Sequence, residues 1–152
     1  MIHQLKSVWR GYVMPMLQRP ERLQVAALCY RTRPQGREVL LITSRGTGRW
    51  ILPKGWPIKG LDAAGAALQE AWEEAGVLSG RTGPDPVGAY VYQKGLPGDW
   101  SVAVRTLVFP VEVYELADDF PEADQRRREW VTPEEAAARV DEPDLKGILA
   151  TF

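Results

Sequence analysis

One segment of the sequence, residues 62–77, limits the possible folds more strongly than any other. Its small and apolar residues recur at intervals of three and four, the period of a helix with one buried face; they are Ala64, Ala67, Leu68, Ala71 and Ala75. Asp62 is placed to cap the first turn of this helix and Gly76 to end it. Because the buried stripe consists mostly of alanine, the sequence predicts a helix that lies close against a sheet.

The same predicted helix carries three glutamates on one face. Glu70, Glu73 and Glu74 are spaced i, i+3 and i+4, so their Cβ atoms lie about 5–6 Å apart. No Lys or Arg occupies a position in the helix that could relieve their repulsion, and the helix dipole disfavours negative charge near the C-terminal end. A solvated acidic face is the common explanation of such a run. A bound divalent cation is the other, and it would supply the missing positive charge.

The segment in front of the helix is consistent with a cation site. A predicted strand ends near Leu52 and is followed by a loop rich in Gly and Pro that contains Lys54, Gly55 and Lys59. Such a loop can turn backbone carbonyls toward a cation held by the helix and can place two lysines beside it. The alternative is an ordinary connecting loop.

The rest of the chain predicts a single α+β domain, which its 152 residues suit. Residues 1–22, interrupted by two prolines, are expected to form an N-terminal arm before a domain over 23–152. Pro110 is expected to mark an edge or a bulge in the last strand. We expect strands at 23–30, 39–43, 50–52, 87–92 and 102–114, loops at 44–49, 80–86, 93–99 and 118–128, and helices over 133–140 and after Pro143. This order favours a mixed sheet between helices.

Composition narrows the class of function. Nineteen Lys and Arg residues against twenty Asp and Glu give a net charge of −1, which argues against a general nucleic-acid or membrane-surface binder. The single cysteine, Cys29, excludes an intramolecular disulfide and fits a reducing compartment. No apolar run approaches the roughly 20 residues of a membrane span, and the first residues do not resemble a signal peptide. We therefore expect a cytoplasmic protein.

From Leu52 to Val77 the chain resembles the Nudix box, whose pattern is Gly, five residues, Glu, seven residues, then Arg-Glu-apolar-any-Glu-Glu-any-Gly-apolar. The matching residues are Gly55, Glu70, Ala71, Glu73, Glu74, Gly76 and Val77. Two positions differ, with Leu61 in place of the first Glu and Gln69 in place of the Arg. In the family these two side chains brace the loop against the helix, so their joint replacement bears on loop rigidity and rate more than on metal binding.

The resemblance implies a Nudix-type α/β/α sandwich with a central mixed sheet, and an Mg²⁺- or Mn²⁺-dependent pyrophosphate hydrolase that uses metal-activated water. Glu70 and Glu74 would be the primary metal ligands, Glu73 a third or water-mediated ligand, and the Gly55 carbonyl would complete the shell. All-oxygen ligation is what such hard cations prefer. The proton of the attacking water would pass to Glu70, to Glu73 or to a carboxylate outside the helix, and Glu70 is our first choice as catalytic base.

Outside the box the chain resembles the diphosphoinositol polyphosphate phosphohydrolase branch, which also cleaves diadenosine polyphosphates. The arginines before Glu129 and Trp130 are the most specific element of this likeness, although a solvated loop would also account for them. The candidates for binding substrate phosphates are Arg45, Arg49, Lys54, Arg105 and Arg126. The basic cluster expected before the first strand is reduced to Arg22, which favours a less highly charged ligand such as a dinucleoside polyphosphate.

Several alternatives stay open. Trp56 and Trp100 are the two loop tryptophans that could stack an adenine, although a role in covering the core or the sheet is the commoner one for tryptophan. The protein could instead be a nucleoside triphosphate or nucleotide-sugar pyrophosphatase of the same family. It could also be a non-catalytic Nudix-fold module that binds a phosphorylated ligand, as the replacements at Leu61 and Gln69 suggest. The expected partner is a small-molecule phosphoanhydride, without nucleic acid or membrane, and a homodimer is an open option.

Overall fold

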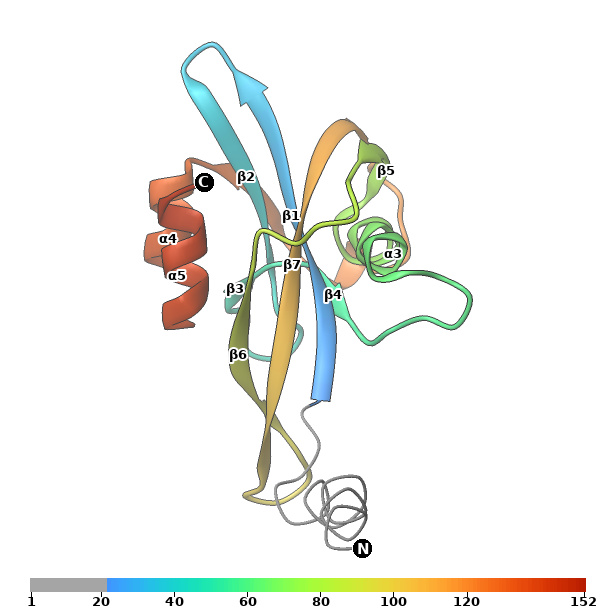
Figure 1. Cartoon of the computed structure of the whole chain (residues 1–152), viewed down its shortest axis with the longest axis vertical. Coiled ribbons are helices and arrows are strands. Elements are labelled where there is room, and N and C mark those ends of the chain that lie inside the picture. Colours follow the sequence, from blue (N-terminus) through green and yellow to red (C-terminus); the bar gives the residue numbers. More distant parts are fainter. Residues whose placement is uncertain (1–21) are drawn as a thin grey trace, which may run out of the picture.

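The computed structural model describes residues 22–152, so the predicted N-terminal arm lies outside the described residues except for Arg22, which begins the first strand. The elements are β1 (Arg22–Arg33), β2 (Gly36–Thr43), β3 (Trp50–Ile51), β4 (Lys54–Gly55), α3 (Ala63–Ala75), β5 (Val77–Arg81), β6 (Gly88–Gly95), β7 (Ser101–Leu116), the 3₁₀ turn η2 (Ala123–Gln125), β8 (Arg128–Val131), α4 (Pro133–Arg139) and α5 (Pro143–Ala150) (Figure 1). Within this range no helix combines the length and the apolar character needed to cross a lipid bilayer.

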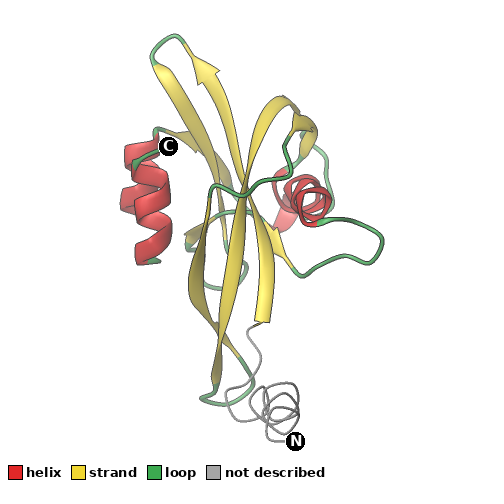
Figure 2. Cartoon of the chain, viewed as in Figure 1, coloured by secondary structure: helices red, strands yellow, loops and turns green. Residues whose placement is uncertain are grey.

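A mixed sheet lies between helices on both faces, which confirms the predicted sandwich. Helix α3 covers one face, and α4 and α5 cover the other (Figure 2). The strand order is β3-β2-β1-β7-β5, with β4 added to β1, β6 to β7 and β8 to β2. The two central strands, β1 and β7, run parallel, and the other strand pairs are antiparallel.

Strand β1 supplies both hydrophobic cores. Val25, Ala27 and Cys29 pack on the side of α3, whereas Ala26 and Leu28 pack on the side of α4 and α5. A strand buried on both faces has no polar side, and this explains the nearly continuous apolar run in its sequence.

Helix α3 forms as the sequence predicts. The Asp62 carboxylate accepts a hydrogen bond from the Gly65 amide at 2.7 Å, and Gly76 ends the helix in a left-handed conformation with φ of 74°. The alanines of the predicted stripe, Ala67, Ala71 and Ala75, are fully buried against the sheet. Small side chains on this face therefore bring the helix axis, and the glutamates it carries, close to β1 and β4.

Three short strands were not predicted: β4 lies in a segment expected as a loop, and β5 and β8 lie mostly in segments to which no element was assigned. Strand β8 pairs with β2, and β5 pairs with the end of β7 through two register irregularities. Their sequences lack a clear period of two because pairing to a strand distant in sequence, and not local preference, makes them extended.

The predicted position of Pro110 at an edge or bulge is wrong, since β7 is a central strand. Along β7, pairing with β6 ends at Val108 and pairing with β5 begins at Glu112. Pro110 lies between these two partners, where the amide hydrogen that it lacks is not needed for either pairing.

Candidate functional site

A cavity of about 700 Å³ opens between α3, strands β1, β4 and β6, and the loop that precedes β8. All four residues of the predicted metal site line it, namely Gly55, Glu70, Glu73 and Glu74. The structure therefore brings the loop and the helix of the predicted site together around one concave surface.

Gly55 and Glu70 are in direct contact, and the contact explains the glycine. Strand β4 pairs with β1 through Val25 and Gly55, which fixes the backbone of Gly55 next to α3. A Cβ atom at position 55 would overlap the Glu70 carboxylate. Only glycine lets the backbone approach the carboxylate so closely.

Glu74 is held from the same side. Its carboxylate accepts a hydrogen bond from the Lys54 amide at 3.3 Å, and it also shares a hydrogen bond with Glu70. The pKa of Glu70 is raised to about 8, mainly by burial and also by the hydrogen bond to Glu74 and the negative charges of the neighbouring glutamates. Burial also raises the pKa of Glu74, against the opposing effect of Arg126. Two carboxylates this close cannot both be ionised cheaply, so they retain a proton unless a cation replaces it.

Glu73 is oriented along the helix. The Gln69 side chain donates a hydrogen bond to the Glu73 carboxylate at 2.9 Å, one turn further on. Gln69 therefore braces a glutamate of its own helix and not the preceding loop. Leu61, at the position of the other bracing residue, is 47% exposed.

The donor set fits a hard divalent cation. The Glu70 and Glu74 carboxylates lie together against the backbone of β4, and every candidate ligand is an oxygen atom. Among residues 22–152 no three acidic, His or Cys side chains are arranged to enclose an ion, which agrees with Glu73 being turned toward Gln69. The adjacent Glu70 and Glu74 carboxylates, whose pKa values are both raised, are the observation that fits a metal.

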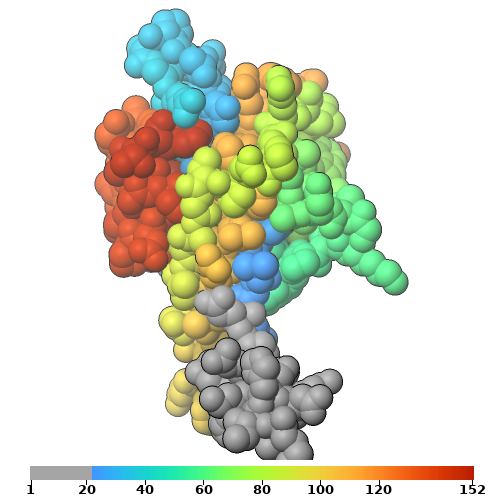
Figure 3. Space-filling model, viewed as in Figure 1, coloured from blue at the N-terminus to red at the C-terminus, as the bar shows by residue number. Residues whose placement is uncertain are grey.

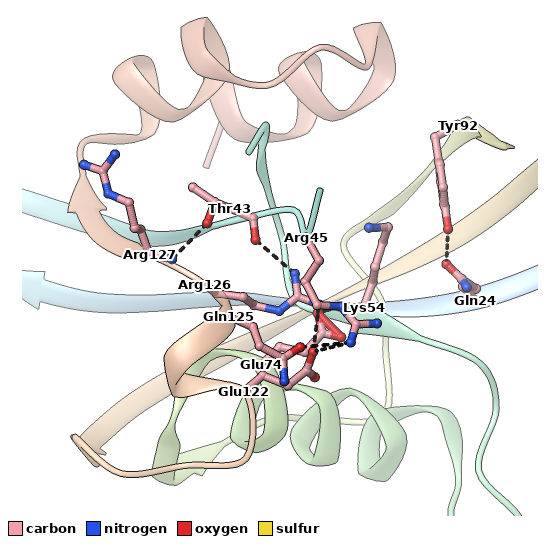
Figure 4. Close-up of polar contacts among 10 residues, drawn as sticks. All are labelled: Gln24, Thr43, Arg45, Lys54, Glu74, Tyr92, Glu122, Gln125, Arg126 and Arg127. Atoms are coloured by element: carbon pink, nitrogen blue, oxygen red, sulfur yellow. Dashed lines mark hydrogen bonds and ion pairs between the residues drawn. The ribbon is translucent and has the colours of Figure 1, made fainter. Parts of the chain in front are cut away.

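Arg126 lies beside Glu74 and Glu122, and its side chain is only 7% exposed (Figure 4). Its Nη1 donates to the Thr43 carbonyl at 3.0 Å, and its Nη2 donates to Glu122 at 3.1 Å and lies 3.5 Å from Glu74. The glutamates thus have a counter-charge within the protein, which the helix sequence did not indicate because the arginine comes from a distant loop.

Glu122 is a cavity residue that the sequence analysis missed. Its backbone amide donates to the Glu73 carbonyl at 3.0 Å, which fastens the loop before β8 to α3. Its carboxylate lies between Arg126 and Arg45, 3.5 Å from the Arg45 guanidinium. The spacing of Glu122 and Arg126, four residues apart, was the available signal, but such pairs are common on protein surfaces.

Three cations face the cavity more openly than Arg126. Arg45 lies at the rim, where its side chain is 61% exposed and donates to the Gln125 side chain at 3.0 Å (Figure 4). Lys54 is partly buried, with its Nζ 4.9 Å from the centre of the Tyr92 ring, and burial lowers its pKa. Lys94, which the sequence analysis did not single out, places its Nζ 5.6 Å from the centre of the Trp56 ring.

Two predicted phosphate-binding residues do not line the cavity. The Arg49 guanidinium lies 3.3 Å from both Asp141 and Glu142, just before α5. Arg105 is exposed on β7, where it is paired with Leu23 of β1 and Val91 of β6. Successive side chains along a strand point to opposite faces of the sheet, and the neighbouring Thr106 takes the buried face in place of Arg105.

Of the two loop tryptophans, Trp56 lines the cavity and Trp100 does not.

Comparison with known proteins agrees with this architecture. A model of the NUDIX domain matches residues 22–152. Diphosphoinositol polyphosphate phosphohydrolase 3-alpha of Mus musculus is 33% identical over 115 residues, which cover 74% of this chain and 65% of that protein, so the chain spans just under two thirds of its curated relative.

Two solved structures share the fold. The Ap4A hydrolase of C. elegans is 20% identical, with a TM-score of 0.65, and the match covers 88% of this chain and 96% of that one. The dihydroneopterin triphosphate pyrophosphohydrolase of E. coli is 17% identical, with a TM-score of 0.60 and coverage of 86% and 93%.

Proposed function

This chain belongs to the Nudix family, and on that basis we propose that it hydrolyses a phosphoanhydride bond in a diphosphoinositol polyphosphate or a dinucleoside polyphosphate. The observation that carries the proposal is the pair of adjacent carboxylates, the half-buried Glu70 and the buried Glu74, held beside Gly55 and Lys54 in the wall of a large cavity. The names of the relatives supply the two substrate classes: phosphohydrolases of diphosphoinositol polyphosphates and an Ap4A hydrolase.

We propose Mg²⁺ or Mn²⁺ as the cofactor. Glu70 and Glu74 would hold it, with Glu73 and the Gly55 carbonyl completing the oxygen ligands. When bound, such a cation neutralises phosphate charge and lowers the pKa of a water molecule. Because the pKa values of Glu70 and Glu74 are raised, we expect cation binding to displace a proton from the pair.

The chain's own residues bind the substrate and move the proton. Arg45 and Lys54 on the cavity wall would bind phosphate oxygens, and Lys94 joins them, whereas Arg49 and Arg105 lie away from the wall. Arg126 would act indirectly, by holding Glu74 and Glu122 in place. Glu70 remains our first choice for the group that accepts the proton of the attacking water, with Glu73 as the alternative.

Two further functions are supported by particular residues. The replacement of the bracing pair by Leu61 and Gln69 favours a non-catalytic binding module that uses the same cavity. The apolar part of the wall is compatible with a nucleoside triphosphate or nucleotide-sugar pyrophosphatase. A cytoplasmic location is part of the proposal and is supported by Cys29, which is a buried thiol.

An assay of pyrophosphate substrates with Mg²⁺ or Mn²⁺ tests the proposal. We expect the unmodified protein to hydrolyse at least one of them, and Glu74→Gln to lower kcat by at least roughly 100-fold, because it removes a charged metal ligand. Glu134→Gln, at an exposed position of α4, is the matched control and should retain full activity. Undiminished hydrolysis by the Glu74 variant would contradict the metal site. Binding of substrates without turnover by the unmodified protein would favour the binding module.

A further inference from the structure

The outer wall of the cavity is apolar where the loop after β4 forms it. Trp56, Pro57, Ile58 and Leu61 all line the cavity. Ile58 packs against the core on the α3 side, whereas Trp56 is 40% exposed and Leu61 is 47% exposed. The loop projects from the body of the protein next to α3 (Figures 1 and 3). Ile58 thus anchors the loop, whereas Trp56 and Leu61 are exposed and line the cavity.

Exposure of these apolar side chains to water is unfavourable in free energy unless a ligand covers them. Large apolar residues exposed together at the rim of a cavity are typical of binding surfaces. Leu61 contributes to this apolar surface in place of the glutamate that the Nudix box has at that position. Leucine removes a charge from this position and adds apolar surface to the wall that Trp56 also lines.

The charged part of the wall suits a short chain of phosphates better than an inositol ring that carries many phosphate groups. Four glutamates line the cavity, Glu70, Glu73, Glu74 and Glu122, and they offset its cations. Among those cations Arg126 is buried and bonded to Glu122, and Arg45 is bonded to Gln125. A densely phosphorylated inositol needs many cations on all sides, and this wall has an apolar side instead.

We propose that Trp56 and Leu61 form a nucleobase subsite, and that the substrate class is therefore nucleoside or dinucleoside polyphosphates in preference to diphosphoinositol polyphosphates. The indole of Trp56 stacks on the base, Leu61 contacts it, and Lys94, beside the indole, reaches the nearest phosphate. The phosphate chain then extends toward the Glu70–Glu74 pair. This inference rests on the proposed function and specifies its substrate.

The test compares Trp56→Ala with Trp100→Ala, a matched tryptophan that is 69% exposed and lies away from the cavity wall. The substrates are diadenosine pentaphosphate, a diphosphoinositol pentakisphosphate and inorganic tripolyphosphate. We expect Trp56→Ala to raise KM and lower kcat/KM for the dinucleotide by about 5- to 150-fold, the effect of losing one stacked base. Activity on tripolyphosphate should stay within about twofold, Trp56→Phe should retain most dinucleotide activity, and Trp100→Ala should change neither.

The outcomes separate the subsite from the proposed function. Hydrolysis by the unmodified protein with an equal loss on all substrates in Trp56→Ala, or with the inositol compound as the better substrate, would overturn the subsite and leave the proposed function standing. If nothing is hydrolysed, the proposed function fails, and calorimetric binding of ADP still decides the subsite. Trp56→Ala should weaken ADP binding by the same factor without weakening tripolyphosphate binding, and equal binding of ADP by both proteins would overturn it.

Discussion

At the scale of single residues, the candidate site concentrates negative charge in a place where solvent does little to screen it. Glu70 is in contact with the backbone of Gly55, and Glu74 is among the few charged residues that are buried, at 6% exposure. Helix geometry sets the separation of their Cβ atoms, so the two side chains remain neighbours on one face of α3. Arg126 offsets part of this negative charge, and a proton or a cation offsets the rest, so stability depends on both pH and metal.

Replacement of Glu70 by Gln tests this link in metal-free protein. A carboxyl group whose pKa rises on folding binds its proton more tightly when folded. Its contribution to stability is complete below the ordinary pKa of 4.5 and is lost as the pH rises toward about 8. With EDTA present, Glu70→Gln should therefore be more stable than the unmodified protein at about pH 8.5, by roughly 1 kcal/mol or 2–4 °C in Tm, a modest value because the side chain is half exposed. At about pH 4 the difference should vanish, since both side chains are then neutral.

Thermal unfolding followed by circular dichroism measures this difference. Added Mg²⁺ should stabilise the unmodified protein more than the variant, because only the former keeps the full ligand set. The exposed Glu134→Gln control should show no pH-dependent difference. A Glu70 variant that is less stable than the unmodified protein by the same amount at both pH values would contradict the retained proton.

At the scale of elements, the C-terminal end of α3 is joined to the loop that precedes β8. The Ala75 carbonyl accepts from the Arg128 side chain at 2.8 Å, and the Gly76 carbonyl accepts from the Ala117 amide at 2.8 Å. Together with the bond from Glu122 to Glu73, these contacts satisfy carbonyls that a helix end leaves without partners. The end of α3 therefore positions the loop that carries Glu122 and Arg126, and these two side chains in turn lie beside the glutamates of α3.

A comparison of Gly76, at the end of α3, with Gly60, in the loop before α3, separates the free-energy cost of backbone strain from the cost of steric overlap. Both have positive φ, 74° and 87°, but a Cβ at Gly76 would overlap the Phe120 ring and the Arg128 guanidinium, whereas a Cβ at Gly60 meets no atom within 4 Å. Gly60→Ala should lower the free energy of unfolding by about 1 kcal/mol, from backbone strain alone. Gly76→Ala should lower it by at least about 2 kcal/mol, because Phe120 and the loop must also shift.

Denaturant unfolding of the two variants provides the measurement. Equal losses of stability would mean that Phe120 and Arg128 yield without cost, and this would contradict the tight fit between the helix end and the loop.

At the scale of the whole molecule, the central strand β1 is covered on both of its edges by other strands and on both of its faces by hydrophobic cores. It pairs with β7 along most of its length and with β2 and β4 on its other edge, and it has a hydrophobic core on each face. Cys29 is fully buried in this strand, and burial raises the pKa of its thiol to about 12. Local fraying of the sheet edges would not expose it.

The thiol of Cys29 should therefore report global unfolding. At about pH 8 the raised pKa alone lowers the thiolate fraction about 10³-fold below that of the unfolded chain, so a thiol-specific reagent should react only through unfolding. Labelling should be complete at once in concentrated guanidinium chloride, and saturating Mg²⁺ should slow it in buffer, because the ion binds the folded state. Labelling that is faster than unfolding, as followed by circular dichroism, would show that β1 opens locally.

Local patterns in the sequence determined a large part of this protein. Helix α3 could be predicted from the alanine stripe, the cap at Asp62 and the glycine at position 76, because each of these acts on residues within one or two helical turns of itself. The spacing of Glu70, Glu73 and Glu74 placed them on one face for the same reason. The apolar runs predicted the long strands and, with the order of helices, the sandwich that the structure confirms.

Only the tertiary structure decided which groups meet these glutamates. Gly55 contacts Glu70 because the register of β4 on β1 places it there, and Arg126 and Glu122 reach the site because their loop closes over the end of α3. Strands β5 and β8 exist through pairing with distant partners, and Arg49 and Arg105 lie away from the cavity because of the face or the edge on which they stand. Such contacts depend on sheet register and loop closure over long stretches of chain, and no local period in the sequence encodes them.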